Sequence, residues 1–252
     1  MSDLVAADGT AYGRGLGTSD LVAAAHGTAD RRGIRAVHDL VREIAGQRTE
    51  VPVSLGFVDV DHPALSGVVD RVVGDGARAV VVPLLLSSGY HVCRDVAGEV
   101  TRYPGVVAAA GALGPDAAVA EILADRVREL PVADRVVLAA AGSSDPRALR
   151  DCSVVAAELS LVLGVPVEVG YVSGAGERLS SVLARVSGRV AVATYLLAPG
   201  FFADRVAAIA GRASRPLGAD PRLAALALRR YDEVEGLRFG RGDLRQVQAT
   251  AG

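Results

Sequence analysis

Short apolar runs recur along the first half of this chain. They cover residues 21–25, 51–58, 79–86 and 106–110. The runs are rich in valine and lack polar alternation, which is typical of strands covered on both faces. We therefore predict four buried strands in this half.

The segments between these runs carry apolar residues at helical spacing. One helix face contains Ile34, Val37, Val41 and Ile44, and Asp30 stands where a helix could begin. A second face contains Val68, Val69, Val72 and Val73. Strands that alternate with helices predict a parallel sheet with right-handed crossovers.

The second half repeats the pattern. Strands are expected near 135–140, 165–172 and 189–197, and helices over 146–163, 177–185 and 221–233. The chain is thus predicted to be an α/β protein with two similar open parallel-sheet βαβ domains.

Three motifs of the first half recur in the second half without their ionisable side chains. Residues 21–27 return as 137–142, residues 51–59 as 165–173, and residues 83–91 as 194–202. The apolar frame survives in each pair, but the aligned polar residues differ. Ala141 replaces His26, Ser173 replaces Asp59, and Phe202 replaces His91. This pattern predicts a duplicated fold that keeps one working site.

The division of the chain follows from this repeat. Pro131 ends a helical run and frees the next strand, so a boundary is expected there. We predict a catalytic half over residues 18–131 and a degenerate half over 132–238. Segments 1–17 and 239–252 are expected to be loose ends.

Composition excludes several classes of function. The chain has 252 residues, with 27 basic and 29 acidic side chains, so no nucleic-acid partner is expected. No apolar run approaches the ~20 residues that span a bilayer, and the N-terminal residues lack a signal-peptide core, so no membrane partner is expected. Two cysteines without a CxxC motif favour the cytoplasm. The absence of lysine excludes a P-loop and Schiff-base chemistry.

The candidate chemistry lies at strand ends. His26 follows the first strand, Asp59 ends the second, and His91 lies in the loop after the third. Since the carboxyl ends of parallel strands meet at one rim, these three side chains are expected to lie together. Two imidazoles and a carboxylate suit a divalent metal or proton transfer.

The same residues resemble a known family. The motifs are residues 25–28 with Asp30, residues 57–59 followed by Pro63, and residues 83–91. Together they are similar to the ATP-independent sirohydrochlorin chelatases, the class II group that includes cobalt-inserting enzymes. The resemblance runs from about Asp20 to about Glu233.

The resemblance implies roles for particular residues. It makes His26 and His91 the catalytic, metal-handling and proton-accepting histidines. Asp59 occupies a place where relatives often have glutamate, and its shorter arm makes direct metal ligation less secure. His62 is a further candidate ligand. The expected substrate-binding residues are Ser87, Ser88, Gly89, Tyr90 and Arg94, with Arg31, Arg32 and Arg102 nearby.

The implied activity is insertion of Fe²⁺ or Co²⁺ into sirohydrochlorin, for siroheme or cobalamin, with Ni²⁺ as a further candidate metal. The metal would be a substrate, with no permanently bound cofactor, and the protein a monomer. Two alternatives stay open: a non-catalytic tetrapyrrole or metal carrier, and a histidine-dependent phosphoryl-transfer enzyme. The latter favours arginine before the histidine, where this chain has Ala25.

Overall fold

The computed structural model of the chain describes residues 18–87 and 90–239, with the side chains of residues 90–95 outside that description. The predictions for segments 1–17 and 240–252, and for Ser88 and Gly89, therefore lie outside the described residues. In the described part, no helix has the length and apolar character needed to cross a membrane.

Two parallel sheets confirm the predicted α/β class. The first sheet has the order β2-β1-β3-β4 and the second the order β6-β5-β7. The two sheets share a register, since Ala25 pairs with Phe57 in the first and Ala140 pairs with Tyr171 in the second. The strands are β1 (Asp20–Ala25), β2 (Val53–Phe57), β3 (Ala79–Pro83), β4 (Val107–Ala109), β5 (Arg135–Ala140), β6 (Val167–Tyr171) and β7 (Val190–Tyr195).

Strand β3 ends three residues before its apolar run does. The predicted strand reached Leu86, but the last residue of β3 is Pro83. Leu84 is buried, and Leu85 and Leu86 are half-buried in the loop that follows. The loop itself is covered by protein, so hydrophobicity alone does not mark the end of the strand.

The described part has eight helices, of which six connect consecutive strands and the last two follow β7. They are α1 (Arg31–Gln47), α2 (Leu65–Gly74), α3 (Tyr90–Arg102), α4 (Ala117–Arg128), α5 (Pro146–Leu163), α6 (Leu179–Arg185), α7 (Phe201–Ala210) and α8 (Pro221–Arg238). Helix α7 was not predicted, because Val206 is its one buried residue and Phe201, Phe202 and Ile209 are exposed. A helix with so little buried surface has no apolar stripe for a pattern search to find.

Three long helices begin with the same device. Asp30, Asp145 and Asp220 cap α1, α5 and α8, and each carboxylate accepts a hydrogen bond from the backbone N–H two residues later. An N-cap of this kind satisfies one of the free donors of the first turn and stabilises a helix by about 1 kcal/mol. The caps fix the first residue of each helix. For α1 and α5 they thereby fix the number of residues between the preceding strand and the helix.

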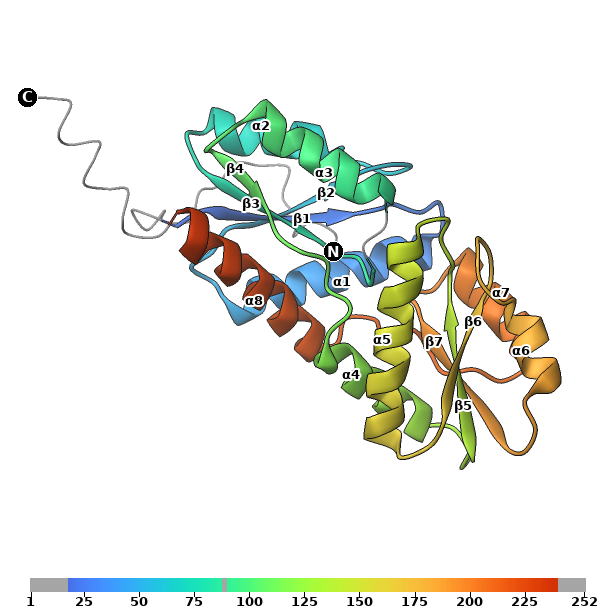
Figure 1. Cartoon of the computed structure of the whole chain (residues 1–252). Coiled ribbons are helices and arrows are strands. Elements are labelled where there is room, and N and C mark those ends of the chain that lie inside the picture. Colours follow the sequence, from blue (N-terminus) through green and yellow to red (C-terminus); the bar gives the residue numbers. More distant parts are fainter. Residues whose placement is uncertain (1–17, 88–89, 240–252) are drawn as a thin grey trace, which may run out of the picture.

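The helices form layers around the sheets (Figure 1). Helices α2 and α3 cover one face of the first sheet, and α6 and α7 cover one face of the second. Between the sheets lie α1, α8, α4 and α5. Buried residues of both sheets and of these four helices make one continuous hydrophobic core.

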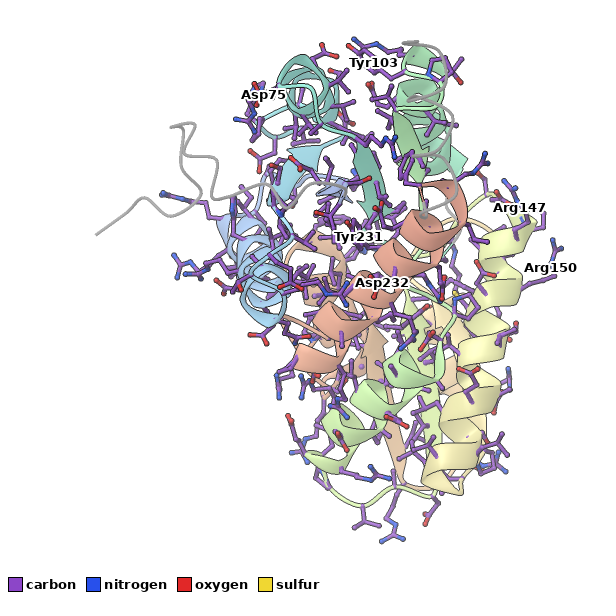
Figure 2. The ribbon with its side chains drawn as sticks, turned by 90° about the vertical axis from the view of Figure 1, so that its left-hand side faces the viewer. Asp75, Tyr103, Arg147, Arg150, Tyr231 and Asp232 are labelled. Carbon is purple, nitrogen blue, oxygen red and sulfur yellow. The ribbon has the colours of Figure 1, made fainter. Side chains whose placement is uncertain are left out.

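Helices α4 and α8 are exchanged between the halves. Helix α4 follows β4 in the chain but packs against α5 and β7, whereas α8 comes last and packs against α1 and β3. Tyr231 points from α8 into the interior (Figure 2), where its hydroxyl donates to the carbonyl of Ser19 at 2.6 Å. The two exchanged helices meet through a buried ion pair of Arg126 with Asp220 at 3.0 Å.

Candidate functional site

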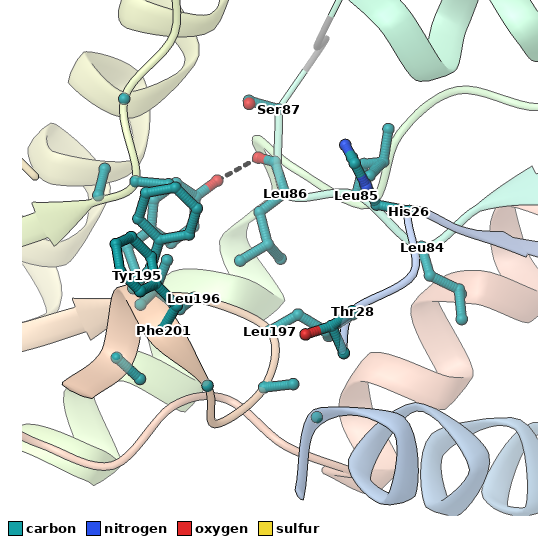
Figure 3. A pocket seen from close by; sticks show the side chains of 18 of the residues that line it. His26, Thr28, Leu84, Leu85, Leu86, Ser87, Tyr195, Leu196, Leu197 and Phe201 are labelled. Atoms are coloured by element: carbon teal, nitrogen blue, oxygen red, sulfur yellow. Dashed lines mark hydrogen bonds between the residues drawn. The ribbon is translucent and has the colours of Figure 1, made fainter. Parts of the chain in front are cut away.

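A cavity of about 430 Å³ lies between the carboxyl ends of the two sheets. Both halves line it, with loop residues that follow β1 and β3 on one side and residues that follow β5 and β7 on the other. The size falls within the range of small-molecule pockets. Figure 3 shows His26, Thr28 and Leu84 on one side, facing Tyr195 and Phe201 on the other.

The position of His26 follows from the end of β1. Ala25 is buried as the last residue of the strand, and His26 is the first residue beyond it and is exposed. Next comes Thr28, whose hydroxyl accepts the backbone N–H of Asp30 at 3.1 Å. The turn therefore runs directly into the cap of α1 and presents the imidazole at the cavity.

Gly27 brings the loops after β1 and β2 into direct contact. It has φ +95°, and a Cβ added there would lie 1.8 Å from the carbonyl oxygen of Asp59. The backbone N–H of Asp59 donates to the carbonyl of His26 at 2.9 Å. Only glycine permits this approach, which makes His26 and Asp59 backbone neighbours although 33 positions separate them.

The second half repeats this contact without the polar tips. Gly142 has φ +99°, and a Cβ there would lie 1.9 Å from the carbonyl oxygen of Ser173. The backbone N–H of Ser173 donates to the carbonyl of Ala141 at 2.9 Å. The frame predicted from the motifs is thus the same in both halves, whereas the imidazole and the carboxylate occur in the first alone.

Tyr195, at the end of β7, links the two walls of the cavity. It is buried, and its hydroxyl donates to the carbonyl of Leu86 in the loop after β3 (Figure 3). Phe201 lies near Tyr195 and is 65% exposed, so an aromatic surface faces the open space. The motif comparison treated this half as degenerate and did not single out Tyr195. The strand-end rule that found His26 applies equally to β7 and could have found it.

Arg32 joins the halves at the edge of the cavity. Its guanidinium pairs with Asp30 at 2.7 Å and with Asp204 of α7 at 2.6 Å. The hydrogen bonds that Asp30 accepts from the side chain and the backbone N–H of Arg32 lower the pKa of Asp30 to about 2. Arg32 lies near the loop after β1, as the sequence indicated, and acts there as an ion-pair partner across the two halves.

The predicted metal-binding residues are only partly brought together. Asp59 and His62 are both exposed in the loop after β2, and neither lines the cavity. His91 lies at the start of α3, but its side chain is outside the described part. Within the described residues no group of three or more His, Cys, Asp or Glu side chains could hold a metal ion. Ligation by His26, Asp59, His62 and His91 stays a prediction.

The predicted substrate-binding residues are similarly divided. Ser87 lines the cavity, and its role in substrate binding stays a prediction. Ser88 and Gly89, and the side chains of Tyr90 and Arg94, lie outside the described residues. Arg102 forms ion pairs with Glu99 and Asp70, both at 2.7 Å, and it does not line the cavity.

Burial keeps the weak acids of the cavity protonated. It raises the pKa of the Cys152 thiol to about 11 and the pKa of Tyr171 to about 12. Burial also raises the pKa of Tyr195 well above its usual value. Among the described lining residues, the imidazole of His26 is the remaining side chain that can act as a general base.

Cys152 should react slowly with alkylating reagents. A thiol with a raised pKa is almost entirely protonated at pH 8, and the thiolate is the reactive form. Iodoacetamide at pH 8 should modify Cys152 in the native protein at least about tenfold more slowly than in urea. Peptide mass spectrometry separates its peptide from that of Cys93. Equal rates in the two states would contradict the buried position.

A sequence model of the CbiX family matches the chain twice, over residues 20–130 and 135–234. The chain belongs to the CbiX family. The two matches cover one half each. The resemblance to sirohydrochlorin chelatases is confirmed.

Two curated relatives align with parts of this CbiX chain. A sirohydrochlorin cobaltochelatase of Sulfurisphaera tokodaii is 32% identical over 80 residues, which are 31% of this chain and 67% of the relative. A sirohydrochlorin ferrochelatase of Bacillus subtilis is 34% identical over 116 residues, 42% of this chain and 44% of the relative. The aligned part thus spans less than half of the Bacillus protein.

Solved structures agree with the CbiX fold. SirB from Bacillus subtilis with Fe³⁺ superposes with a TM-score of 0.77 at 20% identity, over 88% of this chain and 98% of that one. The sirohydrochlorin chelatase SirB from Bacillus subtilis subspecies spizizenii, in complex with cobalt, gives 0.71 at 22% identity over the same shares. At these identities the likeness shows that the fold is shared.

Proposed function

We propose that this chain inserts a divalent metal, Fe²⁺ or Co²⁺, into sirohydrochlorin without hydrolysis of a nucleotide. The observation that carries the proposal is the cavity between the halves, which joins an apolar interior to the imidazole of His26. Family membership and the names of the two curated relatives support it. Both halves belong to one chain, so a monomer completes the cavity.

The lining suits a flat macrocycle. Leu84, Leu86 and Leu197 contribute aliphatic surface, and Tyr195 and Phe201 contribute aromatic surface. Apolar walls remove water from the two faces of a ring and favour its burial by about 25 cal/mol per Å². His26 is exposed at the end of β1, so a metal ion can approach the ring nitrogens from solvent on this side.

Metal insertion needs proton acceptors as well as a pocket. Two pyrrole N–H protons must leave as M²⁺ enters, so charge is conserved. In this proposal His26 accepts one proton at the cavity wall, and His91, at the start of the adjoining helix, accepts the other. Asp59 supplies negative charge beside His26 and attracts the incoming cation, a role that does not require direct ligation.

The choice of metal follows from ligand chemistry only in part. Imidazole and carboxylate groups bind Fe²⁺, Co²⁺ and Ni²⁺, and selectivity among them often follows supply. The rates of insertion measured with each metal therefore show whether the protein favours an iron or a cobalt tetrapyrrole as its product.

The test is anaerobic incubation of purified protein with sirohydrochlorin and each of Fe²⁺, Co²⁺ and Ni²⁺, without ATP. The absorbance change that accompanies insertion should be faster with protein than without it for at least one metal. A strict nucleotide requirement, or no acceleration with any metal, would refute the proposal. Tight binding of sirohydrochlorin without turnover would favour the carrier instead.

A phosphoryl-transfer enzyme finds no support in the cavity. Phosphate sites need cationic side chains or clusters of backbone donors. No arginine is among the described residues that line this cavity, and the chain has no lysine. The residue before His26 is the buried Ala25, as the sequence indicated.

A further inference from the structure

A second hollow, of about 410 Å³, opens beside the cavity in the second half of the chain. Tyr171, Phe201 and Phe202 line both spaces, so the two adjoin across these aromatic rings. Two cationic side chains line the hollow, Arg178 at the start of α6 and Arg205 on α7.

Neither of these arginines is held in an ion pair within the described part of the chain. The guanidinium of Arg205 lies 5.7 Å from the ring centre of Phe201. Arg178 makes one long hydrogen bond, 3.4 Å, to the carbonyl of Val172. By contrast, Arg185 at the end of α6 pairs with Glu168 and Glu177. Arg178 and Arg205 thus keep donors for an anion.

The residue that replaces Asp59 borders this hollow. Ser173 lines it, at the position equivalent to the carboxylate of the first half. Its hydroxyl donates to the carbonyl of Ala141 at 2.8 Å. An aspartate at position 173 would pair with the nearby arginines or repel an acidic ligand. Because this position holds a serine, the charge of the two arginines in the hollow is not neutralised there.

The cavity itself offers no such partner. Sirohydrochlorin carries eight carboxylates, and a carboxylate buried without a cation or donors is costly. No arginine is found among the described residues lining the cavity. The carboxylate side chains of a ring bound in the cavity must therefore extend out of it. The hollow with Arg178 and Arg205 lies directly beyond the aromatic residues that line both spaces.

We propose that Arg178 and Arg205 form a subsite for peripheral carboxylates of the tetrapyrrole whose ring occupies the cavity. This inference rests on the proposed function and assigns a binding role to the half that lacks the histidines. A guanidinium can hold a carboxylate through two parallel hydrogen bonds, which fixes its orientation.

The test is the dissociation constant for metal-free sirohydrochlorin, measured anaerobically by quenching of its fluorescence. Arg178→Gln and Arg205→Gln should each raise this constant about tenfold, as expected for loss of a charge-assisted hydrogen bond. Arg205→Lys should restore part of the affinity. Ser173→Asp should weaken binding too, although it leaves both arginines in place.

Arg150→Gln is the matched control. Arg150 is exposed on α5 next to the cavity, lines neither space, and points into solvent in Figure 2. This variant should bind sirohydrochlorin as the unaltered protein does. Melting temperatures of all variants should agree closely, so that unfolding does not imitate weak binding. In turnover, Arg178→Gln and Arg205→Gln should raise KM and leave kcat near its unaltered value.

The outcomes separate this proposal from the proposed function. Unchanged binding in the two arginine variants, with normal insertion by the unaltered protein, overturns the subsite alone. Weaker binding in these variants, with no insertion by the unaltered protein, supports the subsite and overturns the chelatase activity. A protein that binds no sirohydrochlorin overturns both. An equal loss of affinity in Arg150→Gln would reduce the effect to overall charge and overturn the subsite.

Discussion

Replacement of His26 by alanine should lower the rate of metal insertion by about 100-fold or more, the usual effect of losing a positioned proton acceptor. The other ionisable groups described in the cavity cannot substitute for it. The pKa of Cys152, of Tyr171 and of Tyr195 is raised by burial, so these groups stay protonated at neutral pH. The measurement is the initial rate of insertion into sirohydrochlorin with saturating metal.

The fold should survive this change. The side chain of His26 is exposed, and the bond that joins it to the next loop runs through its backbone carbonyl. The free energy of unfolding should therefore change by no more than about 0.5 kcal/mol. Arg150→Gln provides the contrast, because Arg150 is exposed and does not line the cavity. An equal loss in Arg150→Gln, or a rate near that of the unaltered protein in His26→Ala, would place the chemistry elsewhere.

Gly27→Ala should have the largest effect on both stability and activity. The added methyl group would lie 1.8 Å from the carbonyl oxygen of Asp59, and the backbone at φ +95° disfavours any side chain. The two loops must separate to relieve this contact. We expect a loss of about 3 kcal/mol or more in the free energy of unfolding, at the upper end for single substitutions.

Gly142→Ala is the matched variant in the other half. Its methyl group would meet the carbonyl oxygen of Ser173 at 1.9 Å, so the loss of stability should be similar. The effect on activity should differ, because Gly27 also holds Asp59 beside His26, whereas the loop of Gly142 carries neither group. Urea unfolding gives the stability of each variant, and insertion at a temperature where both are folded gives the activity. Equal activity in the two folded variants would show that contact between the loops after β1 and β2 does not position the chemistry.

The sequence predicts the strands of this fold and the residues that directly follow their ends. The apolar runs locate all seven described strands, because strands covered on both faces must be continuously hydrophobic. The shared register of the two sheets explains why the motif comparison placed Ala141 opposite His26. The location of His26 at the cavity follows from the same rule.

The exchange of α4 and α8 could not be predicted in this way. An apolar stripe shows that a helix is covered but does not identify the sheet that covers it. The side chain of Asp59 is a second example. Strand β2 ends two residues before it, and Val60 adopts φ +65°, a strained conformation for a β-branched residue. Periodicity carries no information about such a turn, so the exposed position of Asp59 beside the cavity emerges from the structure alone.

The exchanged helices also bear on why a half without histidines has been retained. Deletion of the second half would remove α8, and the face of the first sheet that packs on it would be left in water. Deletion of the first half would remove α4 and uncover β7 and α5 in the same way. A single copy of the repeat could then persist only by borrowing the missing helix from another chain. Once the two copies were joined and had exchanged helices, mutations could remove the histidines and the aspartate of one copy. Loss of that whole copy would instead expose the hydrophobic core of the other.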